Sequence, residues 1–537
     1  MTTPNTSTRR RFLGGVAAAT TLGAAGFAFP AQARVTAFMQ SVAENAARDP
    51  ALSDFYRLTG YKPIWTGTGG RDKARRQALL KALDGAGTHG LPQAAYDTDL
   101  LRANLRAVKS ERDLGRVEVE LSRLFLTYAR HVQTGVLTPR EVVRDIVRAV
   151  PLRDGVSLLT SFSKSSPGAF LRQLPPGSPE YVRLMKAKLA MEKRLARGGW
   201  GPRVPGKKLQ PGDSGARVVA LRNRMIAMGY MRRSTSQSYD ANLQKAVQRF
   251  QQAHGLNPDG VAGAGTLKEI NVSAQQRLAS ILVAMERERW MNMPRGKRHV
   301  WVNLADFTAA VIDNGKVTFK TRAVVGANKS DRRSPEFSDE MEHMVLNPTW
   351  NVPRSIAVKE YLPLMQRNPN AAGHLRLTRG GRVISREGID FTQYTPANFP
   401  FDLKQPPSRR NALGLVKFMF PNKYNIYLHD TPAKNLFSRE TRAYSHGCIR
   451  LNDPFEFAYT LLKPQVANPK EFFQAKLATG RETVVPLEKH VPVHLVYRTA
   501  FTTAKGKVEY RRDIYGRDAR IFAALQKAGV VLRAVQG

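Results

Sequence analysis

The chain has 537 residues, of which 42% are hydrophobic and 24% are charged, a composition that excludes an intrinsically disordered protein. Its length exceeds what one hydrophobic core organises, so we expect roughly two to four domains. Its formal net charge of +41, from 84 basic and 43 acidic residues, favours polyanionic surroundings, although the charge could serve solubility alone. The sequence has no zinc-finger, RRM-like or dense basic-aromatic pattern, so nucleic acid is not the expected partner.

Residues 1–33 have the pattern of an export signal. Arg9-Arg10-Arg11-Phe12-Leu13 is followed by an apolar, Ala/Gly-rich run over residues 15–29 and by Ala31-Gln32-Ala33. This order predicts a twin-arginine signal peptide that is cleaved after Ala33. A retained membrane anchor is the alternative, but a permanent span needs about 20 strongly apolar residues, and the run over residues 15–29 is shorter and rich in Gly. No other segment is apolar enough to cross a membrane. An exported chain with this charge is expected to meet an anionic cell envelope.

Residues 35–203 are predicted to form a helical scaffold domain. Apolar residues recur at three- and four-residue spacings up to Gly135 and give one buried helix face, made of Val117, Leu121, Leu124, Phe125, Tyr128 and Val132. The cluster Gly198-Gly199-Trp200-Gly201-Pro202 marks the end of this domain.

Residues 207–272 are predicted to form a small bundle of three short helices. The unit resembles the peptidoglycan-binding-like domain of cell-wall enzymes in four places: residues 212–215 (GDSG), 246–251 (AVQRFQ), 255–256 (GL) and 259–260 (DG). The turn glycines and aspartates have a structural explanation, because Gly supplies positive φ and Asp caps the next helix. These motifs therefore specify the fold more firmly than they specify binding. The resemblance implies glycan binding, with a spacer role as the alternative.

After residue 298 the pattern changes to that of strands. Residues 307–313 and 316–325 flank Asn314-Gly315, the dipeptide that a type I′ hairpin turn favours. Residues 416–420 and 426–428 predict a second hairpin with His429 at its exit. Further on, residues 453–456 (DPFE) predict a helix start, with Asp453 as the cap. In the C-terminal extension, residues 488–537, the pattern favours strands at 493–499 and 507–511 and a helix at 518–527, and it indicates no function.

Cys448 is the only cysteine, which excludes an intramolecular disulfide and a cysteine metal cluster. It ends the string Ser445-His446-Gly447-Cys448, and His429 precedes it by nineteen residues. A free thiol has a pKa of about 8.5, so a catalytic cysteine needs a base or positive neighbours. His/Gly/Cys clustering supplies plausible parts for nucleophilic attack on a carbonyl.

Residues 298–487 resemble the L,D-transpeptidase catalytic domain, whose signature is a histidine, about fifteen residues, and then Ser/Thr-His-Gly-Cys. Here fifteen residues separate His429 from Ser445. The resemblance implies that Cys448 is the nucleophile and His429 the general acid/base. It also implies that Gly447 shapes the loop, so that the backbone N–H of Cys448 can hold an oxyanion. His446 is nearer in sequence, but a glycine turn could direct the two side chains apart.

Further residues are predicted to bind substrate or line the pocket: His446, Arg450, Tyr427, Ser445 and Trp350. Each has a structural alternative. Arg450 could form an ion pair, Tyr427 could pack within the hairpin, and Trp350, in a motif that resembles the entry to the donor pocket, could be a core residue. Residues 353–411 form a long insertion rich in Pro, Gly, Arg and Asn, which we interpret as a substrate cap like that of the larger members of the family.

The expected fold is α+β and multidomain, with a mostly β L,D-transpeptidase domain, a capping insertion, a helical scaffold and a three-helix peptidoglycan-binding-like domain. The resemblance implies attack on a stem tetrapeptide of peptidoglycan, release of D-alanine and a 3→3 cross-link, in a Gram-negative periplasm. It implies no metal or organic cofactor, and inhibition by carbapenems. The alternatives are L,D-carboxypeptidase activity, attachment of an envelope protein to the wall, and a wall-binding scaffold with an inactive site. The sequence does not indicate the oligomeric state.

Overall fold

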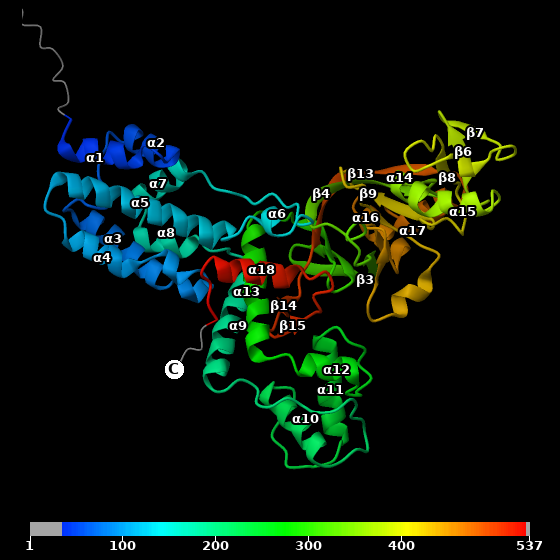
Figure 1. Cartoon of the computed structure of the whole chain (residues 1–537), viewed down its shortest axis with the longest axis horizontal. Coiled ribbons are helices and arrows are strands. Elements are labelled where there is room, and N and C mark those ends of the chain that lie inside the picture. The colour runs from blue at the N-terminus through cyan, green and yellow to red at the C-terminus, as the bar shows by residue number, and fades with distance from the viewer. Residues whose placement is uncertain (1–34, 533–537) are drawn as a thin grey trace, which may run out of the picture.

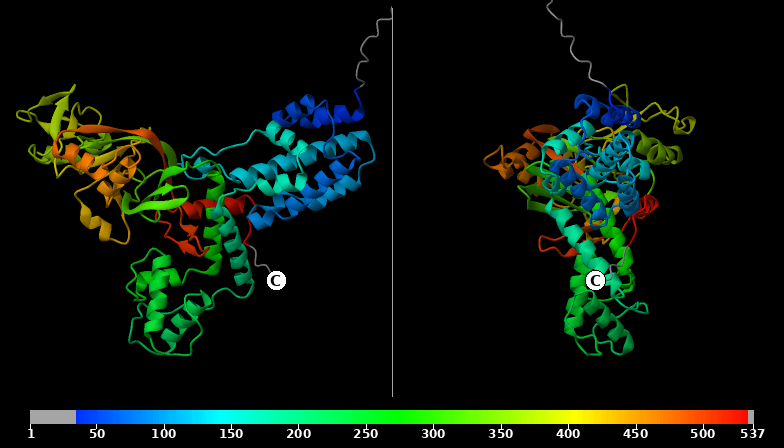
Figure 2. Two further views of the ribbon diagram at one scale, coloured as in Figure 1. Left: turned by 180° about the vertical axis from the view of Figure 1, so that it is seen from behind. Right: turned by 90° about the vertical axis from the view of Figure 1, so that its left-hand side faces the viewer.

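The computed structural model describes residues 35–532, so the expected signal peptide lies outside the described residues. A helical arm and a sheet domain extend to opposite sides of a central junction, and a small helical domain projects below it (Figure 1). The views in Figure 2 show the same three parts. The junction consists of helices α9 (Pro179–Ala196) and α13 (Ala274–Trp290) together with the C-terminal segment, residues 497–532.

The helical arm is the expected scaffold domain. Its longest helix, α5 (Glu111–Thr134), begins with a capping box between Ser110 and Asp113 and ends at Gly135, whose φ is 97°. The predicted stripe on α5 is buried, except that Leu124 is only partly covered. The remaining helices pack around α5: α1 (Ala37–Ala46), α2 (Pro50–Leu58), α3 (Gly70–Asp84), α4 (Thr98–Arg106), α7 (Gly155–Lys164) and α8 (Pro167–Gln173), and the short α6 (Pro139–Val142) leads toward the sheet domain.

The small domain consists of three short helices, as expected: α10 (Ala216–Ala227), α11 (Ala241–Ala253) and α12 (Ala264–Ile270). They enclose one core, and a bridge between Leu209 and Ala262 closes the unit. Helix α13 follows directly and packs against α9 and α18 (Arg517–Lys527). The sequence pattern predicted no helix over the residues of α13. The last turns of α13 bury charged side chains, among them Glu286, Arg287, Glu288 and Arg289. The sequence of α13 therefore lacks the apolar stripe from which a helix is usually predicted.

The sheet domain is built on nine strands in the order β11-β3-β12-β10-β9-β4-β13-β1-β2, and β2 also pairs with β3. The strands are β1 (Arg298–Asn303), β2 (Thr308–Asp313), β3 (Lys316–Gly326), β4 (Phe337–Leu346), β9 (Val416–Met419), β10 (Leu428–His429), β11 (Ala443–Ser445), β12 (Ile449–Leu451) and β13 (Thr483–Val496). Helices α16 (Pro454–Leu462) and α17 (Pro469–Ala478) pack on this sheet.

Strand β13 extends past residue 487, the expected end of this domain. It continues to Val496, and its second half pairs with both β1 and β4. Val493 and Leu495 are fully buried in the same core as the rest of the sheet, so the sheet needs these residues.

Both predicted hairpins are present. Asn314 and Gly315 join β2 to β3 with φ values of 50° and 78°, as a type I′ turn requires. In the second hairpin β9 pairs with β10, and His429 is the last residue of β10. Asp453 does occupy the N-cap position of α16, but its side chain does not cap the helix. That carboxylate instead accepts a hydrogen bond of 2.6 Å from the hydroxyl of Thr321 on β3, so the predicted helix start is present but the side chain of Asp453 does not cap it.

The insertion at residues 353–411 is an ordered subdomain with its own apolar core. Its sheet has the order β5-β8-β6-β7 and includes β5 (Trp350–Asn351), which precedes the insertion. Its other elements are α14 (Arg354–Ile356), the π-turn η3 (Ala357–Tyr361), α15 (Leu362–Arg367), β6 (Arg376–Arg379), β7 (Arg382–Ile384), η4 (Phe391–Gln393) and β8 (Asp402–Gln405). We call this unit the cap subdomain.

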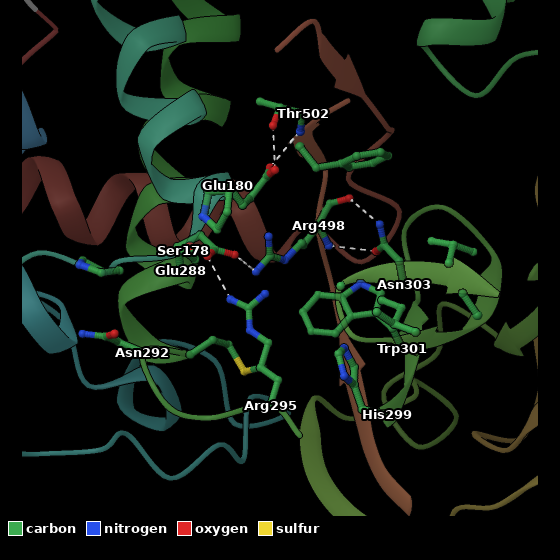
Figure 3. A pocket seen from close by; sticks show the side chains of 18 of the residues that line it. Ser178, Glu180, Glu288, Asn292, Arg295, His299, Trp301, Asn303, Arg498 and Thr502 are labelled. Carbon is green, nitrogen blue, oxygen red and sulfur yellow. Dashed lines mark hydrogen bonds and ion pairs between the residues drawn. The ribbon is translucent and has the colours of Figure 1, made fainter. Parts of the chain in front are cut away.

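The C-terminal segment lies at the junction. After β13 it forms the hairpin β14 (Ala500–Thr502) and β15 (Val508–Tyr510) and then α18, in agreement with the predicted strand at 507–511 and helix at 518–527. A cavity of about 940 Å³ opens between α9, the end of α13, β1 and this segment. Figure 3 shows Glu288 in this cavity, where it accepts hydrogen bonds from Arg295, Arg498 and Ser178.

Candidate active site

Cys448 lies in a short loop between β11 and β12 that only a glycine at position 447 permits. Gly447 has a φ of +123°, a conformation that other residues rarely adopt. The loop is also held from within, because Ser445 Oγ accepts from the N–H of Gly447 at 3.1 Å and donates to the carbonyl of Cys448 at 2.6 Å. The backbone that carries the thiol of Cys448 is therefore held in one conformation.

The pairing of β10 with β12 brings four of the predicted residues to one face. The two strands are parallel, and Leu428 is opposite Ile449 while His429 is opposite Arg450. Because side chains alternate along a strand, Tyr427 and His429 share a face with Cys448 and Arg450. All four line one cavity of about 660 Å³ between the sheet and the cap subdomain.

The thiol of Cys448 is half-buried and protonated in this arrangement. Burial raises its pKa to about 11, and the neighbouring Tyr427 and Arg450 only partly oppose this effect. Its Sγ donates a weak hydrogen bond of 3.4 Å to the carbonyl of Asn425. The site therefore holds a neutral thiol at neutral pH, and attack requires that a base remove the proton.

His429 is a neutral imidazole in this site. Burial, followed by the charge of Arg450, lowers its pKa to about 3. Its Nδ1 is hydrogen-bonded to the carbonyl of Asp430, and because a carbonyl can only accept, Nδ1 carries the proton. Nε2 is then the basic nitrogen. Within residues 35–532 no hydrogen bond joins His429 to Cys448.

The carbonyl that orients His429 belongs to a residue that is itself fixed. The carboxylate of Asp430 is buried, accepts from the N–H of Leu415 at 2.9 Å and pairs with Lys434 at 2.7 Å. Gly414 makes room for it, since a Cβ there would lie 2.3 Å from the Asp430 carboxylate. This support resembles the outer contacts that hold catalytic histidines in one tautomer.

His446 lines the cavity and is directed to the cap subdomain. Its Nε2 lies 2.6 Å from Oε1 of Glu360, which also accepts from Arg332 at 2.5 Å. Glu360 comes from η3, a π-turn of the kind found at functional sites. The prediction that His446 lines the pocket agrees with this geometry, but the sequence pattern did not indicate Glu360 or Arg332. They lie 86 and 114 residues from His446, so no local pattern could reveal them.

Arg450 makes no ion pair with any residue in the described part of the chain. Its Nε atom is buried and has no hydrogen-bond partner there. Burial lowers the pKa of its guanidinium, and the nearby thiol of Cys448 opposes this effect. The described residues thus show no ion pair at Arg450, and the arginine lines the cavity beside Cys448.

Three other predicted contacts have different outcomes. Ser445 is buried at the cavity and its hydroxyl bonds the backbone of its own loop, so its contact with substrate stays a prediction. Trp350 is a core residue of the cap sheet and also lines the cavity, so both interpretations apply. Tyr427 packs between the two cores with its ring centroid 5.6 Å from that of His429, and burial raises its pKa.

The comparisons with known proteins agree with this arrangement. Residues 297–485 match the family described as "L,D-transpeptidase catalytic domain", YkuD. Residues 214–270 match "Putative peptidoglycan binding domain", and residues 50–187 match "Scaffold domain". The three matches follow one another along the chain in the order scaffold, peptidoglycan-binding and L,D-transpeptidase catalytic domain, and they agree with the resemblance found in the sequence.

A curated relative from Haemophilus influenzae, "Putative L,D-transpeptidase", is 31% identical over 259 residues. This match covers 48% of the chain and only half of the relative's own length. Solved L,D-transpeptidases from Stackebrandtia nassauensis and Xylanimonas cellulosilytica are 14% and 15% identical, cover 55% of this chain and 96% and 100% of theirs, and have TM-scores of 0.22 and 0.15. Scores this low add nothing to the assignment.

Among residues 35–532 no helix has the length and apolar character that a membrane crossing needs.

Proposed function

We propose that this protein is a periplasmic L,D-transpeptidase that forms 3→3 cross-links in peptidoglycan through a thioester on Cys448. The observation that carries the proposal is the shared face of β10 and β12, which puts the thiol, His429 and Arg450 in one cavity of a domain that matches the L,D-transpeptidase family. The matched peptidoglycan-binding domain and the export pattern of residues 1–33 support the same setting.

The first half-reaction uses the neutral pair of thiol and imidazole. His429 Nε2 takes the proton as Sγ of Cys448 attacks the carbonyl between the third residue of a tetrapeptide stem and its terminal D-alanine. The oxyanion forms against the backbone N–H of Cys448. The C–N bond then breaks, the proton passes from His429 to the leaving amine, and D-alanine departs from a thioester.

The second half-reaction returns the thiol. The side-chain amine of a third residue on a neighbouring stem attacks the thioester and loses its proton to His429. The C–S bond breaks, and His429 gives the proton back to Sγ. Water or the lysine of an envelope protein could take the place of that amine, with L,D-carboxypeptidase activity or protein attachment as the result.

Arg450 is the charged group of the cavity that best fits an anionic peptide. Its guanidinium, which has no ion-pair partner among residues 35–532, lies beside the nucleophile, whereas Arg332 and Lys359 are already paired with Glu360 and Asp331. Stem peptides carry free carboxylates, and guanidinium groups bind carboxylates with two parallel hydrogen bonds. We assign the cap subdomain, which forms one wall of the cavity, to the ordering of donor and acceptor stems.

The deciding experiment is mass spectrometry of purified muropeptides after incubation with the mature protein. Cross-linked dimers that have lost D-alanine support transpeptidation, and tripeptides alone indicate hydrolysis instead. Incubation with an added envelope protein tests attachment, because a stem peptide bound to a lysine would appear in its digest. Release of D-alanine by Cys448→Ala would contradict the thioester mechanism.

A further inference from the structure

The peptide bond between Gly447 and Cys448 is held from outside the loop by one hydroxyl group. Ser334 Oγ donates to the carbonyl of Gly447 at 2.6 Å and accepts from the N–H of Gly326 at 2.9 Å. In a planar trans peptide the C=O and N–H groups point in opposite directions. The N–H of Cys448 is therefore turned away from Ser334, and no acceptor for it exists in residues 35–532.

Ser334 is fully buried, and the C-terminal segment holds it in place. Arg517, the first residue of α18, donates from Nη2 to the carbonyl of Ser334 at 2.7 Å. The hydroxyl of Tyr515 donates to the carbonyl of Gly326, next to the same turn. Gly326 must be a glycine, since a Cβ there would lie 2.0 Å from the carbonyl of Arg332.

The guanidinium of Arg517 is in turn fixed by a buried ionic network. It pairs with Glu336 at 3.0 Å, and Glu336 also binds Arg287 of α13. Arg287 pairs with Asp518 of α18 at 2.9 Å, which closes the network. All four side chains are almost entirely buried, so the network has little freedom to move.

We infer that the C-terminal segment positions the oxyanion donor of the active site, with Arg517 and Ser334 as the positioning residues. Arg517 holds the turn that carries Ser334, and Ser334 sets the orientation of the peptide that carries the N–H of Cys448. This inference rests on the proposed function only in that it assumes an acyl transfer at Cys448. It gives a role to residues that lie beyond the match to the catalytic domain, which ends at residue 485.

The test compares two reagents that react with the same thiol. A carbapenem acylates Cys448 through a tetrahedral oxyanion, whereas iodoacetamide alkylates it by displacement at carbon with no oxyanion. We expect Ser334→Ala to slow acylation by about 100-fold, as the loss of one oxyanion donor does elsewhere, and to change alkylation by less than about threefold. Ser334→Thr keeps the hydroxyl and should recover most of the acylation rate.

Equal slowing of both reactions in Ser334→Ala would overturn the inference, because it would indicate a general loss of structure. Unchanged acylation would overturn it as well. Thermal unfolding of each variant shows whether it is folded at the assay temperature.

Arg517 is tested with a matched neighbour. We expect Arg517→Lys, which keeps the charge but loses the paired donors, to slow acylation at least tenfold and to leave alkylation nearly unchanged. Arg520→Ala, on the exposed side of α18, should behave like the wild type in both reactions. Equal acylation rates for Arg517→Lys and Arg520→Ala would contradict the role of Arg517.

The two proposals fail in different ways. If the wild type released no D-alanine from tetrapeptide stems but Ser334→Ala lost acylation selectively, the proposed function would be wrong and the positioning role would stand. If D-alanine were released normally by Ser334→Ala, the positioning role would be wrong and the proposed function would stand.

Discussion

His446 and Glu360 lie 86 residues apart in the chain, and a 2.6 Å hydrogen bond joins Nε2 of the histidine to Oε1 of the glutamate. One residue precedes the loop glycine, and the other belongs to the cap subdomain. Because Glu360 also binds Arg332, it ties the cap to two walls of the cavity. The cap subdomain and the loop that carries Cys448 are therefore joined by a direct hydrogen bond.

Removal of the hydrogen bond between Glu360 and His446 should impair the reaction without unfolding the protein. We expect Glu360→Ala to lower kcat/KM for D-alanine release about tenfold, because a small misplacement of reacting groups is costly. Glu360→Gln keeps an acceptor oxygen and should be milder. Glu387→Ala, an exposed glutamate of the same subdomain, is the control. Similar rates for Glu360→Ala and the control would show that the tie has no catalytic effect.

Cys448→Ala should abolish both the acyl-enzyme and D-alanine release. Cys448→Ser should lose about 1,000-fold or more in rate, since a hydroxyl is a far weaker nucleophile than a thiol near neutral pH. Intact-protein mass spectrometry after incubation with a carbapenem measures the adduct directly. The melting temperature should change little, because the side chain is only half-buried. An adduct on Cys448→Ala would place the nucleophile elsewhere.

The raised pKa of Cys448 has a measurable consequence. Burial disfavours the thiolate, so the thiol keeps its proton until the pH approaches about 11. We expect the rate of iodoacetamide alkylation to rise continuously from pH 7 to about pH 10.5, whereas the rate for the denatured chain should be half-maximal near pH 8.5 and level off above about pH 9.5. Cys448 is the only cysteine, so alkylation reports on it alone. A native rate that levels off by about pH 9.5, like that of the denatured chain, would contradict the raised pKa.

The same shift affects stability with a defined sign. The unfolded chain releases the thiol proton near pH 8.5, and the folded chain keeps it to about pH 11. Between these values the unfolded state binds fewer protons, so folding stability falls as the pH rises. Cys448→Ser does not ionise there and should lose less stability over this window. Denaturant unfolding of both proteins at pH 8 and pH 10.5 measures the difference.

Arg450 is expected to act mainly in substrate binding. Arg450→Gln should raise KM for tetrapeptide stems by about tenfold or more, because a carboxylate loses a charged partner in a partly buried cavity. It should also raise the pKa of His429, since the charge of Arg450 is one of the causes that lower it. Arg450→Lys keeps the charge, so its KM should lie between those of the wild type and Arg450→Gln. An unchanged KM in Arg450→Gln would leave only a structural role.

The sequence predicted the parts of the fold that depend on local chemistry. The stripe on α5, the Asn314-Gly315 turn and the strand spacing around His429 all depend on residues a few positions apart, so a single sequence reveals them. The motif from His429 to Cys448 also identified the family, and the structure brings both residues to one cavity. Their catalytic roles stay predictions.

Asp453 illustrates what a local pattern misses. It occupies the predicted N-cap position of α16, but its carboxylate bonds Thr321, 132 residues away, rather than the helix N-terminus. A side chain with several possible partners took the one that the packing of β3 brought nearest.

The sequence by itself determined the local features from which the chemistry is predicted: a lone cysteine, a glycine turn and a correctly spaced histidine. Only the tertiary structure decided which residues hold and orient the side chains and backbone of the site. Glu360 reaches His446 across 86 residues, Ser334 reaches Gly447 across 113, and Arg517 reaches Ser334 across 183. Hydrogen bonds between residues so far apart leave no periodic trace in a sequence, since they depend on how complete domains pack.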